Sequence, residues 1–318
     1  MKGYLTDSAG AVWALPTLLS WDVKHGLGEP CDAFEVSFAY AKELLPLLYG
    51  AVRFRGEYGG ETVFRGVVDE YEVTADGTGL TAAVRGRGLA ALLLDNQCEA
   101  AQYAGVGLDY IVRHHVTPWG VHDVKTGAMA ALGDFTVTSG DSQWSVLKRF
   151  CRFAGGVRPR FTPDGVLLLN GQDGAARAIG PGTAVTAAVI RDSRYGVISE
   201  VLVKNKARGS AETVKNAAYL ARGVRCRRVL AVPRRTGGDA MRYTAQYQIE
   251  ESERGKRTVE LTLPAQFAAF AGDRVSLTAP ALGLSGDYRV YESRCWADAN
   301  GAGTALTLEE RGTDHVAE

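Results

Sequence analysis

The sequence lacks the features that mark disulfide-rich secreted proteins, zinc proteins and membrane proteins. Its five cysteines, Cys31, Cys98, Cys151, Cys226 and Cys295, are odd in number, dispersed, and never in a C-x-x-C arrangement. This pattern argues against a disulfide framework or a zinc site, so we expect small buried thiols in a reduced compartment. The longest aliphatic run, residues 89–94, is far shorter than the roughly 20 residues of a membrane helix, and no signal-peptide pattern opens the chain.

The sequence also lacks an excess of charge of either sign. Lys and Arg total 36 and Asp and Glu total 36, which argues against a protein whose whole surface binds nucleic acid or an anionic membrane. Gly is abundant, with 38 residues, and this favours many turns and β structure. At 318 residues the chain is long for one hydrophobic core, so we expect two or three domains.

No catalytic motif is present. The sequence has no G-x-S-x-G elbow, no local signature around any cysteine, and no G-K-[ST] after the glycines Gly86 and Gly88, which we expect to allow close backbone approach. His114, His115 and His122 have no acid or cysteine at ligand spacing, so helix packing is favoured over a metal site.

Three carboxylates lie close together in the sequence. Asp69, Glu70 and Glu72 resemble the acid pair of a glycosidase. Asp69 and Glu70 are expected on opposite faces of a strand, whereas Glu70 and Glu72 share its wet face. A polar outer strand surface is therefore the favoured interpretation, and we predict no enzymatic activity, no metal and no cofactor.

One local charge asymmetry is present. Residues 204–235 contain ten Lys and Arg residues against one acid, Glu212. This stretch is either a basic surface that contacts an acidic neighbour or guides DNA, or a solvated loop, and the sequence leaves both open. The candidate partner-contact residues are Lys204, Lys206, Arg208, Arg225, Arg227, Arg228, Arg234 and Arg235.

Periodicity divides the chain into three regions. Residues 1–88 read as short strands separated by turn signals, among them Gly59-Gly60, which suits a tight hairpin. Residues 89–184 change to helical spacing and read as a small α/β module, with a helix capped by Asp141 and ended by Gly155. Residues 185–318 return to strands, beginning with one at 197–204, and carry an added helix at 239–254 in which Glu250 precedes Arg254 by four residues.

Six separated stretches in this order carry a resemblance to a known family. They are residues 34–40, 66–70, 85–96, 111–120, 142–155, and 272–275 with 286–290. Together they resemble the tail hub proteins of bacteriophages and phage-like contractile particles, a family that includes the late control gene D type and the baseplate hub.

The resemblance implies an α+β fold with two tail-tube-like β-barrel domains and an intervening small α/β module. The first barrel would span 1–88, with a returning segment near 176–204 left open as its completion, and the second barrel would span 185–318. A weak internal duplication of the two is expected.

The resemblance further implies a structural hub in a tail or baseplate, without catalysis. It would be a homotrimer that adapts a six-fold tail tube to a three-fold spike, assembled in the host cytoplasm. The implied partners are the tail tube protein, a separate spike protein and other baseplate proteins, with no membrane, and passage of DNA through the lumen is left open. A tail-tip protein of a non-contractile tail and a tail-associated peptidoglycan hydrolase are the alternatives.

Overall fold

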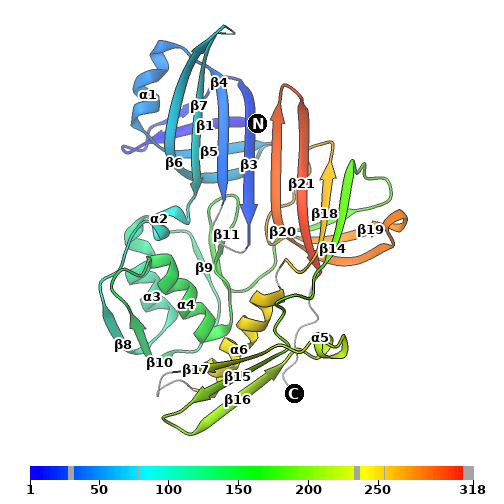
Figure 1. Cartoon of the computed structure of the whole chain (residues 1–318). Helices are drawn as coiled ribbons and strands as arrows, with labels where there is room; N and C mark the ends of the chain where they lie inside the picture. The colour runs from blue at the N-terminus through cyan, green and yellow to red at the C-terminus, as the bar shows by residue number, and fades with distance from the viewer. Residues whose placement is uncertain (28–31, 78, 233–236, 254, 311–318) are drawn as a thin grey trace.

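The computed structural model (Figure 1) describes residues 1–27, 32–77, 79–232, 237–253 and 255–310. Two β units lie side by side, a middle module lies beneath the first of them, and a fourth unit lies at the opposite end from the β units. Buried apolar side chains form a separate cluster in each of these parts. Cys31 lies outside the described residues, while Cys98 and Cys151 are buried free thiols and Cys226 and Cys295 are half-buried ones.

The first β unit forms where the sequence alternates apolar and polar residues. Phe34, Val36 and Phe38 are buried and alternate with exposed or half-buried neighbours, as expected for a strand with one wet face. Gly59 and Gly60 both have positive φ, which confirms the predicted tight turn. The elements are β1 (Lys2–Asp7), β2 (Val12–Ala14), β3 (Leu18–Gly26), β4 (Ala33–Ala39), η1 (Lys42–Leu44), α1 (Leu45–Gly50), β5 (Ala51–Tyr58), β6 (Glu61–Asp76) and β7 (Gly79–Gly88).

The second β unit repeats the strand order of the first. Its elements are β13 (Ala176–Ile179), β14 (Ala187–Asp192), β18 (Arg257–Leu263), β19 (Arg274–Ala279), η3 (Pro280–Leu282), β20 (Leu284–Asp298) and β21 (Gly301–Glu310). The order β14-β18-β21-β20-β19-β13 corresponds to β3-β4-β7-β6-β5-β1. Each unit has a register shift at the same place in its long strand, after Val68 in β6 and after Val290 in β20. One pairing differs, because β13 runs parallel to β19 whereas β1 runs antiparallel to β5.

The two units share one hydrogen-bonded sheet of 13 strands, joined where β20 pairs antiparallel with β3. The two closed barrels of the prediction are not confirmed, because no ladder among the described residues closes either unit on itself. The segment 176–204 does not complete the first unit: β13 and β14 pair with β19 and β18 of the second. The strand that reaches the first unit is β20, from the far end of the chain.

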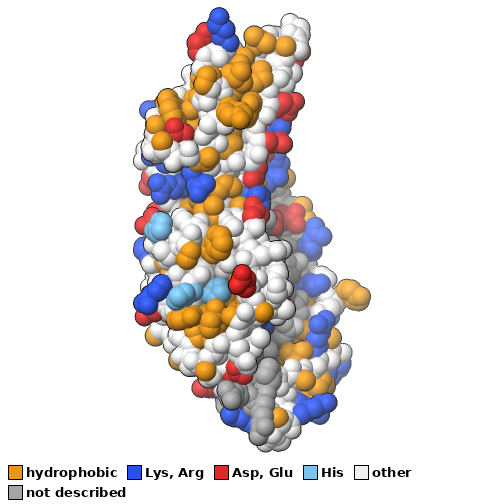
Figure 2. Space-filling view, turned by 90° about the vertical axis from the view of Figure 1, so that its left-hand side faces the viewer, with side chains coloured by type: hydrophobic (Ala, Val, Ile, Leu, Met, Phe, Trp, Pro, Cys, Tyr) orange, Lys and Arg blue, Asp and Glu red, His pale blue; other side chains and the backbone are white. Residues whose placement is uncertain are grey.

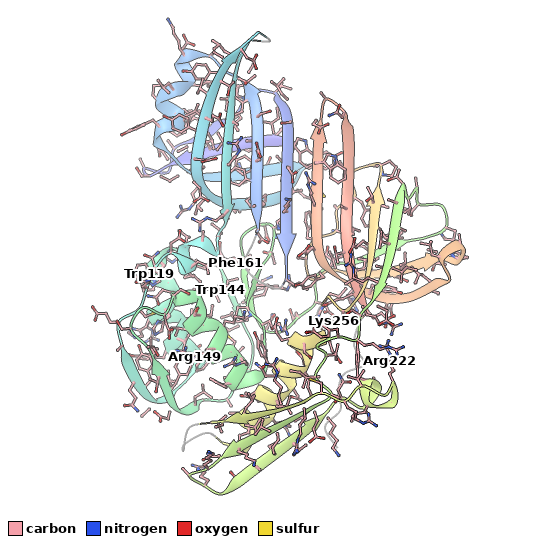
Figure 3. All side chains as sticks on the ribbon, viewed as in Figure 1. Trp119, Trp144, Arg149, Phe161, Arg222 and Lys256 are labelled. Atoms are coloured by element: carbon pink, nitrogen blue, oxygen red, sulfur yellow. The ribbon has the colours of Figure 1, made fainter. Side chains whose placement is uncertain are left out.

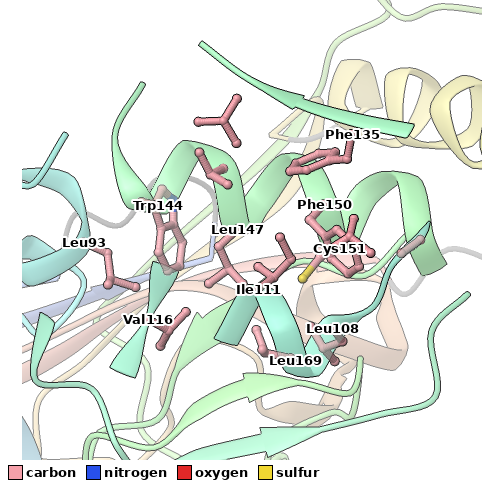
Figure 4. Packing of buried hydrophobic residues seen from close by; sticks show 14 of the residues in the cluster. Leu93, Leu108, Ile111, Val116, Phe135, Trp144, Leu147, Phe150, Cys151 and Leu169 are labelled. Atoms are coloured by element: carbon pink, nitrogen blue, oxygen red, sulfur yellow. The ribbon is translucent and has the colours of Figure 1, made fainter. Parts of the chain in front are cut away.

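The middle module packs short strands around α3 and α4. Its core includes Ile111, Trp144, Leu147 and Phe150 (Figure 4). The elements are α2 (Ala91–Leu94), β8 (Ala101–Val106), α3 (Leu108–His115), η2 (Thr117–Trp119), β9 (Val124–Thr126), β10 (Leu132–Val137), α4 (Gln143–Gly155), β11 (Arg160–Phe161) and β12 (Leu167–Leu169). A turn with Gly165 at positive φ joins β11 to β12.

Both predicted ends of α4 are shifted by one residue. Ser142 caps the helix by accepting a hydrogen bond from the amide of Ser145, and Gly156, with φ of 67°, ends it. Asp141 is not the cap, because its carboxylate accepts hydrogen bonds from the amide of Thr138 at 3.1 Å and from Arg149 at 2.9 Å.

The fourth unit, between β14 and β18, corrects the prediction of one barrel over 185–318. It has its own sheet in the order β16-β15-β17, and α6 packs against β15 and β16. The elements are β15 (Glu200–Asn205), β16 (Ser210–Lys215), α5 (Ala217–Ala221), β17 (Arg227–Ala231) and α6 (Gly238–Glu253). The predicted helix is therefore part of a separate core, and the predicted partner Arg254 lies outside the described residues. No helix in the described ranges is long and apolar enough to cross a membrane.

Candidate functional site

The predicted partner-contact residues lie on the small sheet of the fourth unit. Lys204 is in β15, Lys206 and Arg208 follow it in the turn, Arg225 precedes β17, and Arg227 and Arg228 are in β17. All six are exposed. The parallel pairing of β15 with β17 brings together residues more than twenty positions apart, such as Glu200 and Arg227. Arg234 and Arg235 lie outside the described residues.

Part of this positive charge is balanced within the chain. Arg227 forms an ion pair with Glu200 at 2.8 Å. Arg222 forms one with Asp192 at 2.6 Å, at the junction of the fourth unit and β14 (Figure 3), and this hydrogen bond raises the pKa of Arg222. Arg225 donates to backbone carbonyls of Leu220 and Val224.

The remaining cations of this group are unbalanced. Lys204, Lys206, Arg208 and Arg228 make no ion pair with any described residue. On the side of the sheet away from α6, Val229 is 57% exposed. The surface is therefore a mixed basic and apolar sheet face with an open edge strand, which can accept a partner.

The three neighbouring carboxylates are bonded to arginines of β7. Arg85 contacts Glu70 at 3.1 Å and Glu72 at 3.0 Å, and Arg87 contacts Asp69 at 2.7 Å. These hydrogen bonds raise the pKa of both arginines. The register shift between Val68 and Glu70 is a β-bulge, so Asp69 joins Glu70 on one face. The prediction of opposite faces is therefore wrong. The result is a surface network of ion pairs, in which each of the three carboxylates is bonded to a guanidinium group.

The three histidines have different surroundings. His115 is buried: its Nδ1 lies 2.8 Å from Oε1 of Gln143, and its Nε2 lies 3.1 Å from the hydroxyl of Tyr103. His114 stacks on Tyr110 with ring centroids 4.1 Å apart. His122 is exposed. The described part of the chain holds no group of three or more His, Cys, Asp or Glu side chains placed to bind a metal.

A cysteine beside His115 was not found by sequence reasoning. Sγ of Cys98 lies 3.7 Å from Nδ1 of His115, a pair that could suggest a nucleophile and its base. The two residues are separated by a strand and a helix, so no local motif shows them. Burial raises the pKa of the Cys98 thiol, and both ring nitrogens of His115 have other partners. The pair is therefore part of the core.

His115 gives the stability of the middle module a pH dependence. Burial lowers its pKa from the ordinary value of 6.5, so the unfolded chain binds a proton more readily than the folded one. Stability is then fully present above pH 6.5 and falls as the pH drops below it, by at most about 1.4 kcal/mol per pH unit for one proton. We expect His115→Gln to flatten this slope in chemical denaturation between pH 7.5 and 5.5. The exposed control His122→Gln should keep it, and equal slopes in parent and His115→Gln would contradict the assignment.

The fold is that of phage and prophage tail proteins. The structure is similar to the tail protein from Neisseria meningitidis MC58, with a TM-score of 0.77 and 18% identity over 98% of this chain and 97% of that one. It is similar to the 43 kDa tail protein of prophage MuSo2 from Shewanella oneidensis, with a TM-score of 0.77 and 18% identity over 97% and 98% of the two chains.

A third similar structure comes from a secretion system. It is an Escherichia coli component of the type VI secretion system, itself described as similar to the T4 tail proteins gp27 and gp5. Its TM-score is 0.58 at 13% identity, over 94% of this chain and 76% of that one. No curated protein sequence matches the chain.

The middle module matches a more specific family. Residues 90–171 match the family described as baseplate hub protein gp44-like, second domain. The match covers the whole middle core, from Ala90 to Leu169. The chain thus has a tail-protein fold along its length and a baseplate-hub domain within it, and the resemblance inferred from the sequence is confirmed.

Proposed function

We propose that the chain is the structural hub of a phage tail or phage-like contractile particle, a trimeric ring that adapts the six-fold tail tube to a three-fold spike and has no catalysis of its own. The observation that carries the proposal is the baseplate-hub domain at residues 90–171 inside a tail-protein fold. The tail tube protein, the spike protein and other baseplate proteins would be its partners, in a particle assembled in the host cytoplasm.

The internal duplication supports a ring that adapts six-fold to three-fold symmetry. Because each chain has two β units with the same strand order, three copies would present six similar units to a six-fold tube. The contacts between copies would be heterologous and would close into a ring. In this proposal each unit acts as a tail-tube-like domain. The lumen of the ring would leave room for DNA.

The unpaired sheet edges support a ring that closes between copies. Within one chain, residues 292–297 of β20 pair with β3. Among the described residues, the equivalent half of β6, residues 70–76, pairs with β7 alone, and β14, which corresponds to β3, pairs with β18 alone. Pairing β6 of one copy with β14 of the next would repeat the β20–β3 contact, and its repetition around an axis would close the sheet.

The test of the proposed function is the mass of the assembled form. Native mass measurement of the purified chain, alone and with its spike protein, should give three copies of the chain. A dimer, or a single chain in both conditions, would overturn the ring. The tail-tip alternative predicts the same ring in a particle without a sheath, so a sheath gene beside this one separates the two. The hydrolase alternative has no observation in its favour.

The basic face of the fourth unit is proposed as a contact with another particle component. Reversing Arg227 and Arg228 to Glu should leave the fold intact, because both side chains are exposed and the Arg227–Glu200 ion pair that is lost is a surface pair worth about 1 kcal/mol or less. Particle assembly should weaken about tenfold. The difference should grow at low salt, because screening falls. A control with the same charge change, Arg113→Glu with Lys125→Glu on the middle module, should assemble normally. Equal assembly of the Arg227/Arg228 variant and the parent across a salt series would show a solvated surface instead.

A further inference from the structure

A basic cleft lies where the first β unit meets the middle module. Its volume is about 370 Å³, and its walls come from β1, β5 and β6 on one side and from residues 120–123 and 165 on the other. Lys and Arg side chains gather at this junction on the face shown in Figure 2. Three arginines, Arg53, Arg55 and Arg65, line the cleft, and His122 and Asp123 stand on the opposite wall.

Strand pairing forces these arginines together. Arg55 of β5 is directly opposite Arg65 of β6, and Arg53 lies two residues before Arg55, on the same face. Like charges directly opposite each other on a sheet are destabilising. Such a cluster destabilises the folded chain unless a bound anion balances its charge.

The chain itself balances one of the three charges. Arg55 is bonded to Glu57. Arg53 donates to the carbonyl oxygen of Val52 at 3.1 Å, and Arg65 reaches the carbonyl oxygen of Asp164 at 3.4 Å. Neither Arg53 nor Arg65 forms an ion pair with a described residue. Arg53 is half-buried, and burial lowers its pKa, so its charge is poorly solvated as well as unpaired.

We propose that this cleft binds the carboxylates of an acidic peptide segment from another protein. Guanidinium groups match a carboxylate with two parallel hydrogen bonds, and a pair of them in a partly enclosed site binds it more strongly than exposed lysines would. The cleft also has apolar walls, Val12 and Leu89, beside the cations, which suits a peptide with both kinds of side chain.

Nucleic acid fits this cleft less well than a peptide does. A nucleic-acid backbone carries a charge at each step and is bound by cations spaced along its path, whereas these arginines converge on one hollow. The choice of a peptide as the ligand rests on the proposed function, in which the chain contacts other proteins. Binding itself is measured on the isolated chain.

The experiment measures binding of a blocked tri-glutamate peptide to the full chain by calorimetry at about 50 mM salt, where screening is modest. One peptide should bind per chain, and Arg53→Gln with Arg65→Gln should weaken binding at least tenfold. Arg65→Gln alone, at an exposed position that tolerates substitution, should weaken it at least threefold. The control Arg274→Gln, in β19 and away from the cleft, should bind as the parent does.

Two results would overturn the proposal. The first is equal affinity, or no binding, in the parent and both cleft variants. The second is tighter binding of a ten-residue oligothymidylate than of the peptide, lost in the same variants, which would make the cleft a nucleic-acid site. Loss of the trimer in the mass measurement, with peptide binding intact, would reject the ring and leave the cleft standing.

Discussion

The Ile190→Lys variant is expected to fold normally and to form the trimer at least tenfold less readily than the parent. Ile190 lies in the free edge strand β14 and is 53% exposed, so the substitution should change the stability of the single chain by only about 0.5 kcal/mol. In the proposed ring the same position is covered by β6 of the next copy. A lysine on a sheet edge opposes strand addition, because its charge would have to be buried against the neighbour.

Sedimentation over a concentration series measures this effect. The matched control is Val229→Lys, because Val229 is also a β-branched residue in an edge strand, 57% exposed, but lies on the fourth unit away from the shared sheet. The control should form the trimer as the parent does. If Ile190→Lys and Val229→Lys form it equally well, the copies do not meet through β14.

The Gly86→Ala variant is expected to destabilise the first β unit by about 3 kcal/mol, at the upper end for an overpacked core position. A Cβ atom at Gly86 would lie 1.9 Å from the carbonyl oxygen of Val67 and 2.7 Å from the ring of Phe34. Relief requires β6 and β7 to separate, because one of the two contacts is backbone. The neighbouring Gly66 has the same constraint, with the carbonyl oxygen of Arg87 at 2.1 Å.

The consequence should be local to this pair of strands. Hydrogen exchange followed by mass spectrometry should show faster exchange across 61–88 in Gly86→Ala and no change in 257–310. The control Gly50→Ala, whose Cβ would meet nothing within 4 Å, should exchange as the parent does. Unchanged protection of β6 and β7 in Gly86→Ala would mean that the two strands can move apart at little cost.

The strong glycine requirement explains the shape of the first unit. β6 is 16 residues long and pairs with β5 through its first half and with β7 through its second, so the sheet turns a corner near Gly66, Gly86 and Gly88. Glycine and a β-bulge allow two backbones to approach and bend at such corners. The sequence indicated the close approach at Gly86 and Gly88, and a Cβ at Gly88 would lie 2.7 Å from Cβ of Asp32.

Local patterns in the sequence determined many of the elements of this protein, but not β16, α5 and β17, which lie in the stretch 204–235 that the sequence left open as a surface or a loop. The strands expected in residues 1–88 include β4, and the helix expected between Asp141 and Gly155 matches α4 to within one residue at each end. These signals depend on neighbours a few residues apart, because a strand or a helix repeats over that distance. The family resemblance rested on the order of several such stretches, and the match at residues 90–171 agrees with it.

Only the tertiary structure decided how these elements meet. Trp21 and Ala297 are paired across the joint of the two β units, and Arg55 and Arg65 are brought opposite each other by a hairpin whose register is shifted by a bulge. A pairing between residues hundreds of positions apart leaves no periodic trace in either strand, since each strand alternates in the same way whichever edge it joins. For this reason the sequence specified strands and helices, while the single shared sheet, the separate fourth unit and the basic cleft were set by long-range packing.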